Sequence, residues 1–294
     1  MGEIFDLKKS NPDEIKALQK RSLEVLLYFK KFCDEHNLLF YFCGGCCIGA
    51  VRHQGFIPWD DDIDVFMPRE DYEKLAVLWP LYADTNMYSY CRTNSIHNYH
   101  HAGASIRNNN TTFINRHSVD EDICHGIGID IMPIDGYPNS KIARIKQLFY
   151  AMLFGLFNVQ RLPDNKGTII RALSKIIYTI IPSKKIRYRI WTYAEKQMSK
   201  YKWDECEYVT ELIGSIKGML LKHPKEWFET AIYKDFEGYK MPVMAGYDQY
   251  LKLIFGDYMK LPPEDKRVAK HDTVYINLNE SYKKYKGIYY CVED

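Results

Sequence analysis

The chain has 294 residues, of which 46% are hydrophobic and 27% are charged, and its formal net charge is +2. This size allows one large domain or two ordinary ones with a substantial buried core, and the composition excludes a disordered protein, a collagen and a disulfide-stabilised scaffold. Residues 1–14 are polar and lack the apolar core of a secretory signal. We therefore expect a cytoplasmic protein whose eight cysteines are reduced thiols, most of them buried in the core.

A long amphipathic helix is predicted near the start of the chain. Residues 11–14 combine an asparagine that suits the N-cap, a proline that suits the first helical position and a glutamate that completes a capping box. Apolar residues then recur at helical spacing to about His36. Residues 38–43 are apolar and aromatic, which predicts a strand, and the glycine pair after them predicts a tight turn before a short helix over 46–53.

Two later strands are predicted to carry carboxylates. Residues 59–68 predict a strand in which Asp62 and Asp64 point to the same side, because alternate side chains of a strand share a face. Residues 128–132 predict an apolar strand that carries Asp130. A helix is predicted over 69–79, and the weaker strand candidates are 88–92, 104–107 and 112–115.

The middle of the chain is strongly basic. Residues 141–202 contain fourteen basic residues and two acidic ones, so this segment carries +12 and the rest of the chain −10. Such asymmetry favours an anionic partner for one face. The apolar runs at 148–157 and 176–181 are too short to span a bilayer. The alternatives are a peripheral contact with an anionic membrane and a helical subdomain with a solvated basic face. No nucleic-acid-binding motif accompanies the charge, so nucleic acid is not an expected partner.

Turn-rich residues at 138–140 and 162–167 mark the predicted internal boundaries, with mainly helical structure after them. We expect three parts: a mixed core over 1–140, a basic helical segment over 141–202 and a C-terminal helical part over 203–294.

The most informative feature is a concentration of aspartates. Asp60, Asp61, Asp62 and Asp64 lie within five residues, and Asp130 occupies another apolar strand. Carboxylates on apolar strands are costly unless they are paired or bind a cation. Two on one strand face and a third on a neighbouring strand can hold two Mg²⁺ ions, the arrangement used in phosphoryl transfer. The alternative is that these acids pair with nearby arginines, namely Arg52, Arg69 or Arg107.

Gly44 and Gly45 precede the predicted short helix. A glycine turn lets backbone N–H groups and a helix N-terminus approach a phosphate. A glycine turn, an Asp-x-Asp strand and a third aspartate on a later strand together form the minimal plan of the nucleotidyltransferase fold. We therefore predict an α+β protein in which residues 1–140 form a nucleotidyltransferase-like catalytic core, a mixed β-sheet flanked by helices, followed by a mainly helical basic and C-terminal part.

Other patterns are weaker. The spacing Cys43-x-x-Cys46-Cys47 suggests zinc or redox chemistry, but no second CxxC follows it. Aromatic faces suit a quaternary ammonium ligand, and Trp59 or Tyr99 could form the walls of such a site, although core packing is the alternative.

Residues 44–64, from the glycine pair to Asp62-Ile63-Asp64, closely resemble the signature of the LicD family. Its bacterial members are related to fukutin and fukutin-related protein and belong to the nucleotidyltransferase-fold superfamily. Arg107, residues 110–113 and residues 125–136 resemble the second motif of the family. The third motif is resembled by residues 227–228, 236–238, 247–248, 250–251, 255–259 and 261–263. The resemblance covers roughly residues 20–271 and departs from the family pattern at Cys46-Cys47, where a hydroxyl or apolar pair is usual.

The resemblance implies roles for individual residues. Asp62, Asp64 and Asp130 would be the catalytic residues and metal ligands, and Asp60 and Asp61 would support them or supply a further ligand. The implied donor-binding residues are Gly44, Gly45, Arg52, His53, Trp59 and Arg107. For the two arginines and the histidine a surface ion pair is the alternative, although guanidinium groups match phosphate oxygens well.

The implied reaction is Mg²⁺-dependent transfer of phosphocholine from CDP-choline to a hydroxyl of a cell-surface glycan precursor, with release of CMP. The acceptor would be of the teichoic acid, lipopolysaccharide or capsule type. One Mg²⁺ ion or a pair would act, and Mn²⁺ could substitute. A lipid-linked acceptor at the inner membrane face would give the basic segment a purpose. The alternatives are a CDP-ribitol or CDP-glycerol donor, a nucleotidyltransferase that uses a nucleoside triphosphate, and a non-catalytic scaffold.

Overall fold

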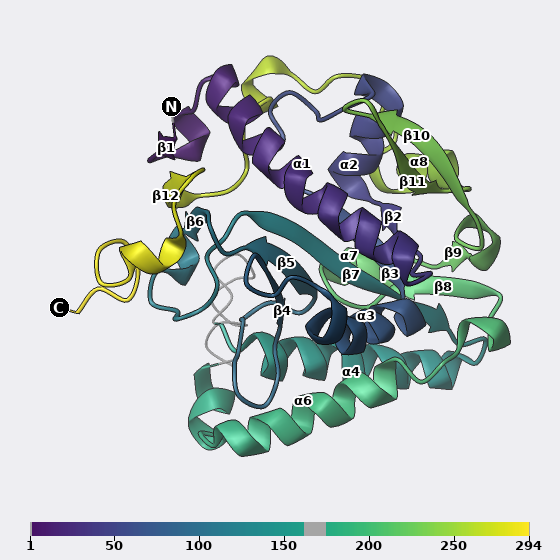
Figure 1. Ribbon diagram of the computed structural model, residues 1–294. Coiled ribbons are helices and arrows are strands. Elements are labelled where there is room, and N and C mark those ends of the chain that lie inside the picture. The colour runs from purple at the N-terminus through teal and green to yellow at the C-terminus, as the bar shows by residue number, and fades with distance from the viewer. Residues whose placement is uncertain (1, 162–174, 294) are drawn as a thin grey trace. The chain divides into compact units, whose positions relative to one another are not determined.

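The computed structural model describes residues 2–161 and 175–293 (Figure 1). The architecture is mixed α+β, as the sequence predicts. The helices described are α1 (Pro12–Glu35), α2 (Gly44–Ile48), α3 (Arg69–Tyr82), α4 (Lys141–Val159), α6 (Lys184–Met198), α7 (Ile216–Leu220) and α8 (Tyr247–Phe255). The strands are β1 (Glu3–Ile4), β2 (Tyr41–Phe42), β3 (Asp64–Pro68), β4 (Tyr88–Arg92), β5 (Ala104–Asn108), β6 (Thr112–Asn115), β7 (Gly128–Tyr137), β8 (Tyr208–Glu211), β9 (His223–Pro224), β10 (Ala231–Phe236), β11 (Tyr239–Met244) and β12 (Thr273–Asn277).

Helix α1 begins at the predicted capping box. Asn11 Oδ1 accepts the backbone N–H groups of Asp13 and Glu14, each at 3.0 Å. The Glu14 carboxylate in turn accepts the N–H of Asn11 at 2.9 Å. These bonds satisfy donors that the first helical turn leaves without intrahelical partners. The long first helix and its N-terminal residue are therefore confirmed.

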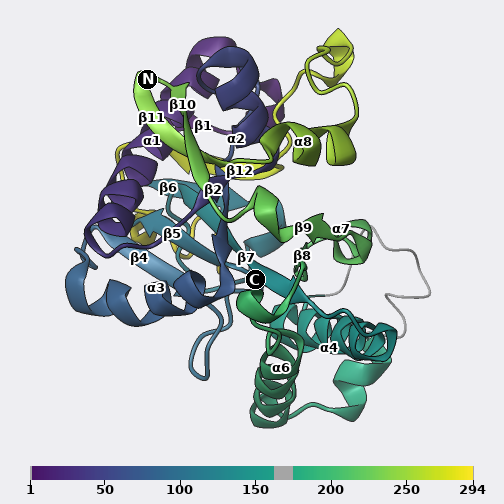
Figure 2. The same cartoon turned by 90° about the vertical axis from the view of Figure 1, so that its right-hand side faces the viewer.

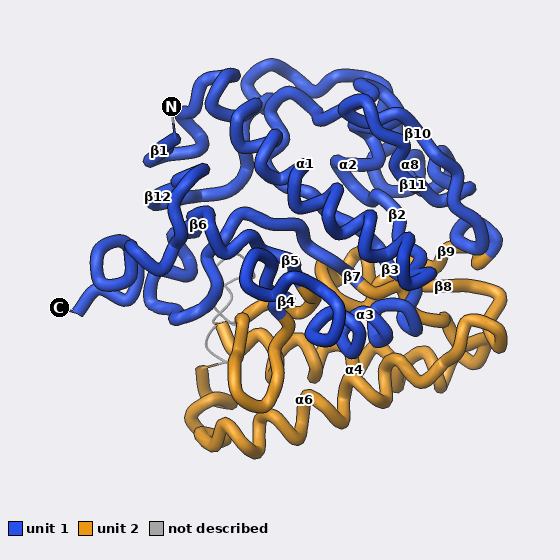
Figure 3. The backbone as a smooth tube through the Cα atoms, viewed as in Figure 1, with its two compact units in different colours: residues 1–91, 105–132, 226–294 blue, residues 92–104, 133–225 orange. Residues whose placement is uncertain are grey.

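The chain divides into two compact units (Figure 3). Unit 1 consists of Met1–Cys91, Ser105–Met132 and Glu226–Asp294, and unit 2 of Arg92–Ala104 and Pro133–Lys225. Strand β7 begins in the first unit and ends in the second. The predicted division at residues 140 and 202 stays a prediction, because compactness alone does not define domains.

The strands of unit 1 bring the aspartate-bearing segments together. The larger sheet has the order β10-β11-β2-β3-β7-β5-β4, so β3 and β7 are neighbours. Strand β2 runs antiparallel to β3, with Phe42 opposite Val65, and parallel to β11, with Phe42 beside Val243. A smaller sheet has the order β1-β12-β6. Because β3 carries Asp64 and β7 carries Asp130, the topology places the two predicted metal-ligand strands side by side.

An aromatic core joins α1 to α3. Phe29 and Phe32 of α1 are buried, and the Phe32 ring lies 4.6 Å from the ring of Trp79. Trp79 is fully buried and its indole N–H donates to the carbonyl of Tyr88 at 3.1 Å. The helix that opens the chain is thus fixed to α3 and β4 by burial of large aromatic side chains, the main favourable contribution to folding.

Several element boundaries differ from the sequence-based expectation. Residues 69–82 form α3 and residues 88–92 form β4, close to the predicted limits, whereas β7 extends five residues beyond 132 to Tyr137. The strand predicted over 59–68 begins only at Asp64. Residues 58 and 59 form a turn, closed by the N–H of Asp60, which donates to the carbonyl of Ile57 at 2.9 Å, and residues 60–63 lead from this turn to the strand without regular secondary structure.

The expectation of mainly helical structure over 203–294 is wrong, because this part contains strands β8 to β12. Strands β10 and β11 form a hairpin closed by Glu237 and Gly238, whose φ angles are +50° and +81°. Positive φ at both central residues is typical of a type I′ turn, the two-residue turn that suits the twist of paired strands. The alternation of apolar and polar residues in this part of the chain is too weak to predict strands, because charged residues interrupt it.

Unit 2 is built on α4 and α6, which lie side by side (Figure 2). The buried side chain of Gln147 on α4 donates to the carbonyls of Gly136 and Met198 at 2.8 and 2.9 Å. These bonds connect α4 to the end of β7 and to the end of α6. The predicted boundary at 162–167 lies outside the described residues. Within the described part of the chain, none of the helices has the length and apolar content needed to cross a bilayer.

Glu211, at the end of β8, is an acid inside unit 2. A Cβ atom added at Gly214 would lie 2.4 Å from one of its carboxylate oxygens, so the side chain packs directly against that glycine. Burial raises the pKa of the Glu211 carboxyl to about 7. The charged form is therefore more favourable in the unfolded chain than in the folded one.

This shift predicts how stability depends on pH. Because the folded-state pKa lies above the unfolded value, the contribution of Glu211 is present below pH 4.5 and is lost as the pH rises to about 7, by about 3 kcal/mol. Glu211→Gln should remove this loss. Urea unfolding of both proteins at pH 5 and pH 8 measures it, and the stability of the variant relative to the native chain should rise with pH. An equal difference at both pH values would contradict the assignment.

Candidate functional site

The aspartates predicted to bind metal lie on one face formed by β3, the residues just before it and the neighbouring strand β7. Asp62 and Asp64 are partly exposed, whereas Ile63 and Val65 between and after them are buried. On β7 the same alternation holds around Asp130. The Asp130 N–H donates to the carbonyl of Ile63 at 2.8 Å, which places Asp130 beside the residue that separates the other two aspartates. The period of two residues therefore brings the three carboxylates to one surface.

The carboxylates repel one another in a poorly solvated place. Burial, and then the charges of Asp62, Asp130 and Asp60, raise the pKa of Asp64 well above its ordinary value. Burial also raises the pKa of Asp62, and burial with the charge of Asp62 raises the pKa of Asp60 to about 7. Mutual effects of this kind require short distances between the groups. The site holds more negative charge than its own basic residues neutralise.

Asp61 has a different role from its neighbours. Its carboxylate accepts the N–H of Lys270 at 3.3 Å, the N–H of His271 at 3.1 Å and a bond from His271 Nδ1 at 3.0 Å. Burial alone would lower the pKa of His271, but the bond to Asp61 and the charges of Asp61, Asp62 and Asp130 raise it to about 9. Asp61 and His271 therefore form an ion pair at the edge of the acidic surface.

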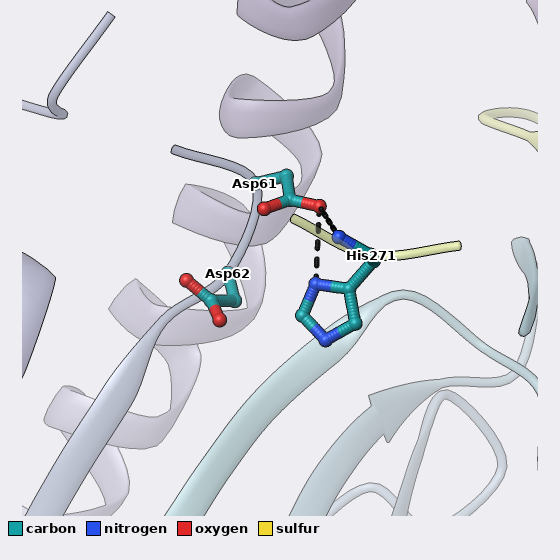
Figure 4. Close-up of side chains that lie close together, drawn as sticks. All are labelled: Asp61, Asp62 and His271. Carbon is teal, nitrogen blue, oxygen red and sulfur yellow. Dashed lines mark hydrogen bonds and ion pairs between the residues drawn. The ribbon is translucent and has the colours of Figure 1, made fainter. Parts of the chain in front are cut away.

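His271 brings a second type of ligand, an imidazole, to the site (Figure 4). One possible ligand atom from each of Asp61, Asp62 and His271 lies within 4.8 Å of the others. Figure 4 shows the Asp62 carboxylate beside the imidazole ring of His271, while the dashed bonds join His271 to Asp61 alone. Asp64 and Asp130 stand outside this trio. The charge of Asp130 raises the pKa values of Asp62 and His271, and the charge of Asp62 raises the pKa of Asp64.

The acidic loop depends on contacts with two earlier segments. A Cβ atom added at Gly45 would lie 2.3 Å from Asp60 Oδ2, so only glycine leaves room for that carboxylate. Gln19 on α1 is buried, and its side-chain amide donates to the carbonyls of Ile57 and Asp60 at 3.0 and 2.8 Å. Gly44 before the short helix has a φ angle of +48°, a value that favours glycine.

Arg107 forms one of the ion pairs that the sequence allows as an alternative to a metal site. Its guanidinium lies 3.2 Å from Asp130 and also donates to the Ser105 hydroxyl and the Gly126 carbonyl. One positive charge therefore faces the acidic surface from β5. Arg69 instead pairs with Glu73 on its own helix at 3.1 Å.

Three predicted donor-binding side chains make contacts within unit 1. The Nε–H of Arg52 donates to His53 Nε2 at 2.9 Å, and its other N–H groups donate to the carbonyls of Tyr258 at 2.6 Å and Lys260 at 3.4 Å. The guanidinium of Arg267 lies 5.7 Å from the centre of the Trp59 ring. Trp59 thus already presents one face to a cation, the interaction that a quaternary ammonium would use.

The cysteines behave as core residues. All except Cys291 are buried, and none forms a disulfide, as expected. Cys46 lies close to the acidic loop, with its Sγ 3.8 Å from the carbonyl of Asp62. Burial, and then the charges of the neighbouring aspartates, raise the pKa of this thiol well above its ordinary value. Among the described residues, the group of side chains that lie close enough together to hold a metal ion contains no cysteine, which argues against the zinc interpretation.

The residues present suit a divalent cation. Hard cations such as Mg²⁺ prefer carboxylate oxygens, and four partly or fully buried aspartates gather here: Asp60, Asp62 and Asp64 have raised pKa values, and Asp61, which is bonded to His271, has a lowered one. A cation would offset the burial and the repulsion that raise the first three values. The sequence analysis missed His271 and Lys270, which lie more than 200 residues from the acidic loop, and the only available signal was that the family resemblance reached residue 271.

Comparisons with known proteins bear on this geometry. Residues 37–141 match the family described as LicD/FKTN/FKRP, nucleotidyltransferase domain. The chain is 30% identical to the lipopolysaccharide cholinephosphotransferase LicD of Haemophilus influenzae over 257 residues, which cover 85% of this chain and 92% of that protein. The chain belongs to the LicD family. It is a transferase of this family, and the region matched contains every aspartate of the acidic surface.

Shorter similarities occur in two further bacteria. An uncharacterized protein of Rickettsia prowazekii is 32% identical over 74 residues, 23% of this chain and 28% of that protein. One of Rickettsia typhi is 36% identical over 56 residues, 18% of each chain. These matches add no information on activity.

The bonds of Gln19 generate a prediction about the LicD site. Gln19→Met keeps the volume but leaves the carbonyl of Asp60 without the Gln19 donor and the carbonyl of Ile57 with the N–H of Asp60 alone, so the free energy of unfolding should fall by about 1–3 kcal/mol and binding of Mn²⁺ should weaken. Chemical denaturation and Mn²⁺ titration measure the two effects.

Lys20→Met is the matched control, because Lys20 is exposed on the next position of the same helix. Equal stability and equal Mn²⁺ affinity in the two variants would show that Gln19 does not position the acidic loop.

Proposed function

We propose that this LicD-family protein transfers phosphocholine from CDP-choline to a hydroxyl of a lipopolysaccharide-type glycan and releases CMP. The observation that carries the proposal is the acidic surface of Asp62, Asp64 and Asp130, in a chain related over nearly the full length of a lipopolysaccharide cholinephosphotransferase. Teichoic acid and capsule precursors are acceptors of the same chemical type.

The proposal assigns the metal to the aspartates. Asp62, Asp64 and Asp130 would hold Mg²⁺, as one ion or a pair, or Mn²⁺ in its place, with Asp60 and Asp61 supporting them. When bound, the metal neutralises the donor diphosphate and orients its phosphorus for displacement. The glycine turn at Gly44 and Gly45 would approach the diphosphate through its backbone N–H groups.

The remaining steps belong to the protein's own groups. The acceptor oxygen forms a bond to the phosphorus of phosphocholine as the bond from that phosphorus to the bridging oxygen of CMP breaks. A carboxylate of the acidic surface accepts the hydroxyl proton. Arg107, His53 and Arg52 are the proposed phosphate contacts, and Trp59, whose ring already faces Arg267, is the proposed wall for the trimethylammonium group.

Two other activities would use the same surface. A CDP-ribitol or CDP-glycerol donor would leave CMP in the same way, and a nucleotidyltransferase would release pyrophosphate from a triphosphate. The third alternative is a scaffold without catalysis. Donor binding and the leaving group separate all of these, because each donor class carries different chemistry on the phosphorus that is attacked.

The first test is isothermal titration of the protein with CDP-choline, CDP-ribitol, CDP-glycerol, CTP and ATP in Mg²⁺. CDP-choline should bind, and Asp62→Asn/Asp64→Asn should lose this binding and lower the release of CMP in the presence of lipopolysaccharide by at least about a hundredfold, about 2.7 kcal/mol of transition-state stabilisation.

The control is Asp120→Asn/Asp122→Asn, an exposed pair of aspartates with the same spacing in unit 1. It should behave as the native protein. Binding of another CDP-alcohol would change the donor, binding of triphosphates alone would favour nucleotidyl transfer, and absence of any binding would favour the scaffold.

We also propose a peripheral contact with the inner face of an anionic membrane, in keeping with a cytoplasmic protein that acts on a lipid-linked acceptor. Helix α4 presents Ile142, Ile145, Phe149 and Met152 on one face, and 54–68% of each residue is exposed. Their spacing of three, four and three residues is helical. Lys141 and Lys146 are exposed on the same helix. An apolar stripe with flanking lysines is typical of a helix that lies in a membrane interface.

Vesicle flotation tests this contact. The protein should float with vesicles of phosphatidylcholine and phosphatidylglycerol more than with phosphatidylcholine alone, and Ile145→Ser/Phe149→Ser should reduce the bound fraction. Val77→Ser/Leu81→Ser on α3 is the control, since these residues have the same spacing and are 63% and 66% exposed. Equal loss in both variants would contradict a specific role for α4.

A further inference from the structure

Unit 2 contains a cavity of about 640 Å³ that the acidic surface does not use. It lies between the loop of residues 93–100 and the first turns of α6, and Gln160 after α4 also lines it. The volume is within the range of sites that hold small ligands. All of its lining residues belong to unit 2, so its shape is set by that unit alone.

The loop that forms one wall is held by its own side chains. Asn94 Oδ1 accepts the N–H groups of Ile96 and His97, each at 2.9 Å. Thr93 Oγ1 accepts the N–H of Tyr99 at 3.1 Å and donates to Asn98 Oδ1 at 3.2 Å. Asparagine side chains that bond to nearby backbone in this way fix a loop without regular secondary structure.

Both ends of the loop are attached to the helices of unit 2. Arg92 forms an ion pair with Glu195 of α6 at 2.9 Å, and both side chains are more than four-fifths buried. At the other end, His100 Nδ1 lies 2.8 Å from the carbonyl of Val159 on α4. The cavity wall is therefore anchored before any ligand binds, which lowers the entropy cost of binding.

The charge of the lining has one sign. Lys184, Lys185 and Arg189 are exposed on α6 and line the cavity, and among residues 2–161 and 175–293 no aspartate or glutamate lines it. Within the described residues no carboxylate pairs with any of these three cations. Three positive charges around one cavity favour an anionic ligand, and the guanidinium of Arg189 suits phosphate or carboxylate oxygens.

The rest of the lining suits a polyhydroxylated ring. Asn98 and Gln160 use their carbonyl oxygens within the protein, Asn98 for Thr93 and His100 and Gln160 for Arg187, which leaves their NH₂ groups to donate. Tyr188 stands edge-on to Trp191, with 5.1 Å between ring centres. An aromatic face accepts the C–H surface of a sugar while amides bond its hydroxyls, whereas a bare phosphate would accept from the amides and leave the aromatic face unused.

We propose that this cavity binds an anionic saccharide, a sugar that carries phosphate or carboxylate. The inference rests on the proposed function, which makes the glycan acceptor the source of that sugar. The cavity would bind the acceptor at a position other than the hydroxyl that reacts. The cations bind the charged group, the amides of Asn98 and Gln160 bind hydroxyls, and the Tyr188 ring supports one face of the sugar.

Saturation-transfer NMR with glucose 6-phosphate as the probe tests the site on the full chain, with glucose, inorganic phosphate and CMP measured in parallel. Glucose 6-phosphate should bind at least tenfold more tightly than glucose or phosphate. Lys185→Glu/Arg189→Glu should abolish this binding, and Lys196→Glu, an exposed lysine on the same helix that does not line the cavity, should retain it.

The aromatic contribution has its own pair of variants. Tyr188→Ala should weaken binding of glucose 6-phosphate at least fivefold and leave binding of inorganic phosphate unchanged, while Tyr188→Phe should keep both. Equal affinity for phosphate and glucose 6-phosphate would reduce the cavity to an anion site, and tighter binding of CMP would make it a nucleotide site. Either result, or no binding at all, overturns the proposal.

A competition experiment distinguishes the glycan acceptor from free sugar phosphates as the source of the sugar. Deacylated lipopolysaccharide oligosaccharide should displace glucose 6-phosphate if the acceptor is the ligand. Failure to displace it, with glucose 6-phosphate still bound, would assign the cavity to free sugar phosphates. Because these experiments use no nucleotide donor, their outcome is independent of whether CDP-choline binds at the acidic surface.

Discussion

Crowding of carboxylates at the start of β3 is the constraint on which the rest of unit 1 depends. Asp60, Asp62 and Asp64 are drawn out of water and raise one another's pKa values, a costly arrangement without a positive partner. Arg107, His271 and the backbone N–H groups near Lys270 offset part of this charge. The negative charge that remains favours binding of a cation, which is the property that a phosphotransferase needs.

The surrounding fold provides the space and the backbone contacts that the crowded carboxylates need. Gly45 leaves room for the Asp60 carboxylate, and Gln19 bonds the carbonyls of the turn that precedes Asp62. These residues lie outside the sheet, and the ladder begins only at Asp64. Helix α1 therefore contributes to the site through its position, although none of its residues is acidic at that point of contact.

Unit 2 has the opposite electrostatic character. Its α6 helix presents lysines and an arginine to a cavity that also offers amide donors and an aromatic ring. On the proposals made above, an acidic surface that would hold a metal and a basic cavity that would hold an anionic sugar are complementary requirements for an enzyme that joins a nucleotide-linked group to a charged glycan. The exposed apolar stripe of α4 adds a surface of a third kind, suited to the place where a lipid-linked glycan is found.

The sequence by itself determined the local features, because they follow from spacing along the chain. The capping box at Asn11, the shared side of Asp62 and Asp64 and the apolar strand around Asp130 depend on periods of 3.6 and 2 residues that covalent geometry imposes. The LicD motifs add the family to that list. Only the tertiary structure decided that His271 pairs with Asp61, that Gln19 holds the acidic turn and that Arg107 faces Asp130. Those partners lie far apart in the chain, and strand order and helix packing, rather than local spacing, bring them together. The hairpin of β10 and β11 shows the same limit, since it joins the sheet through the pairing of β11 with the distant strand β2.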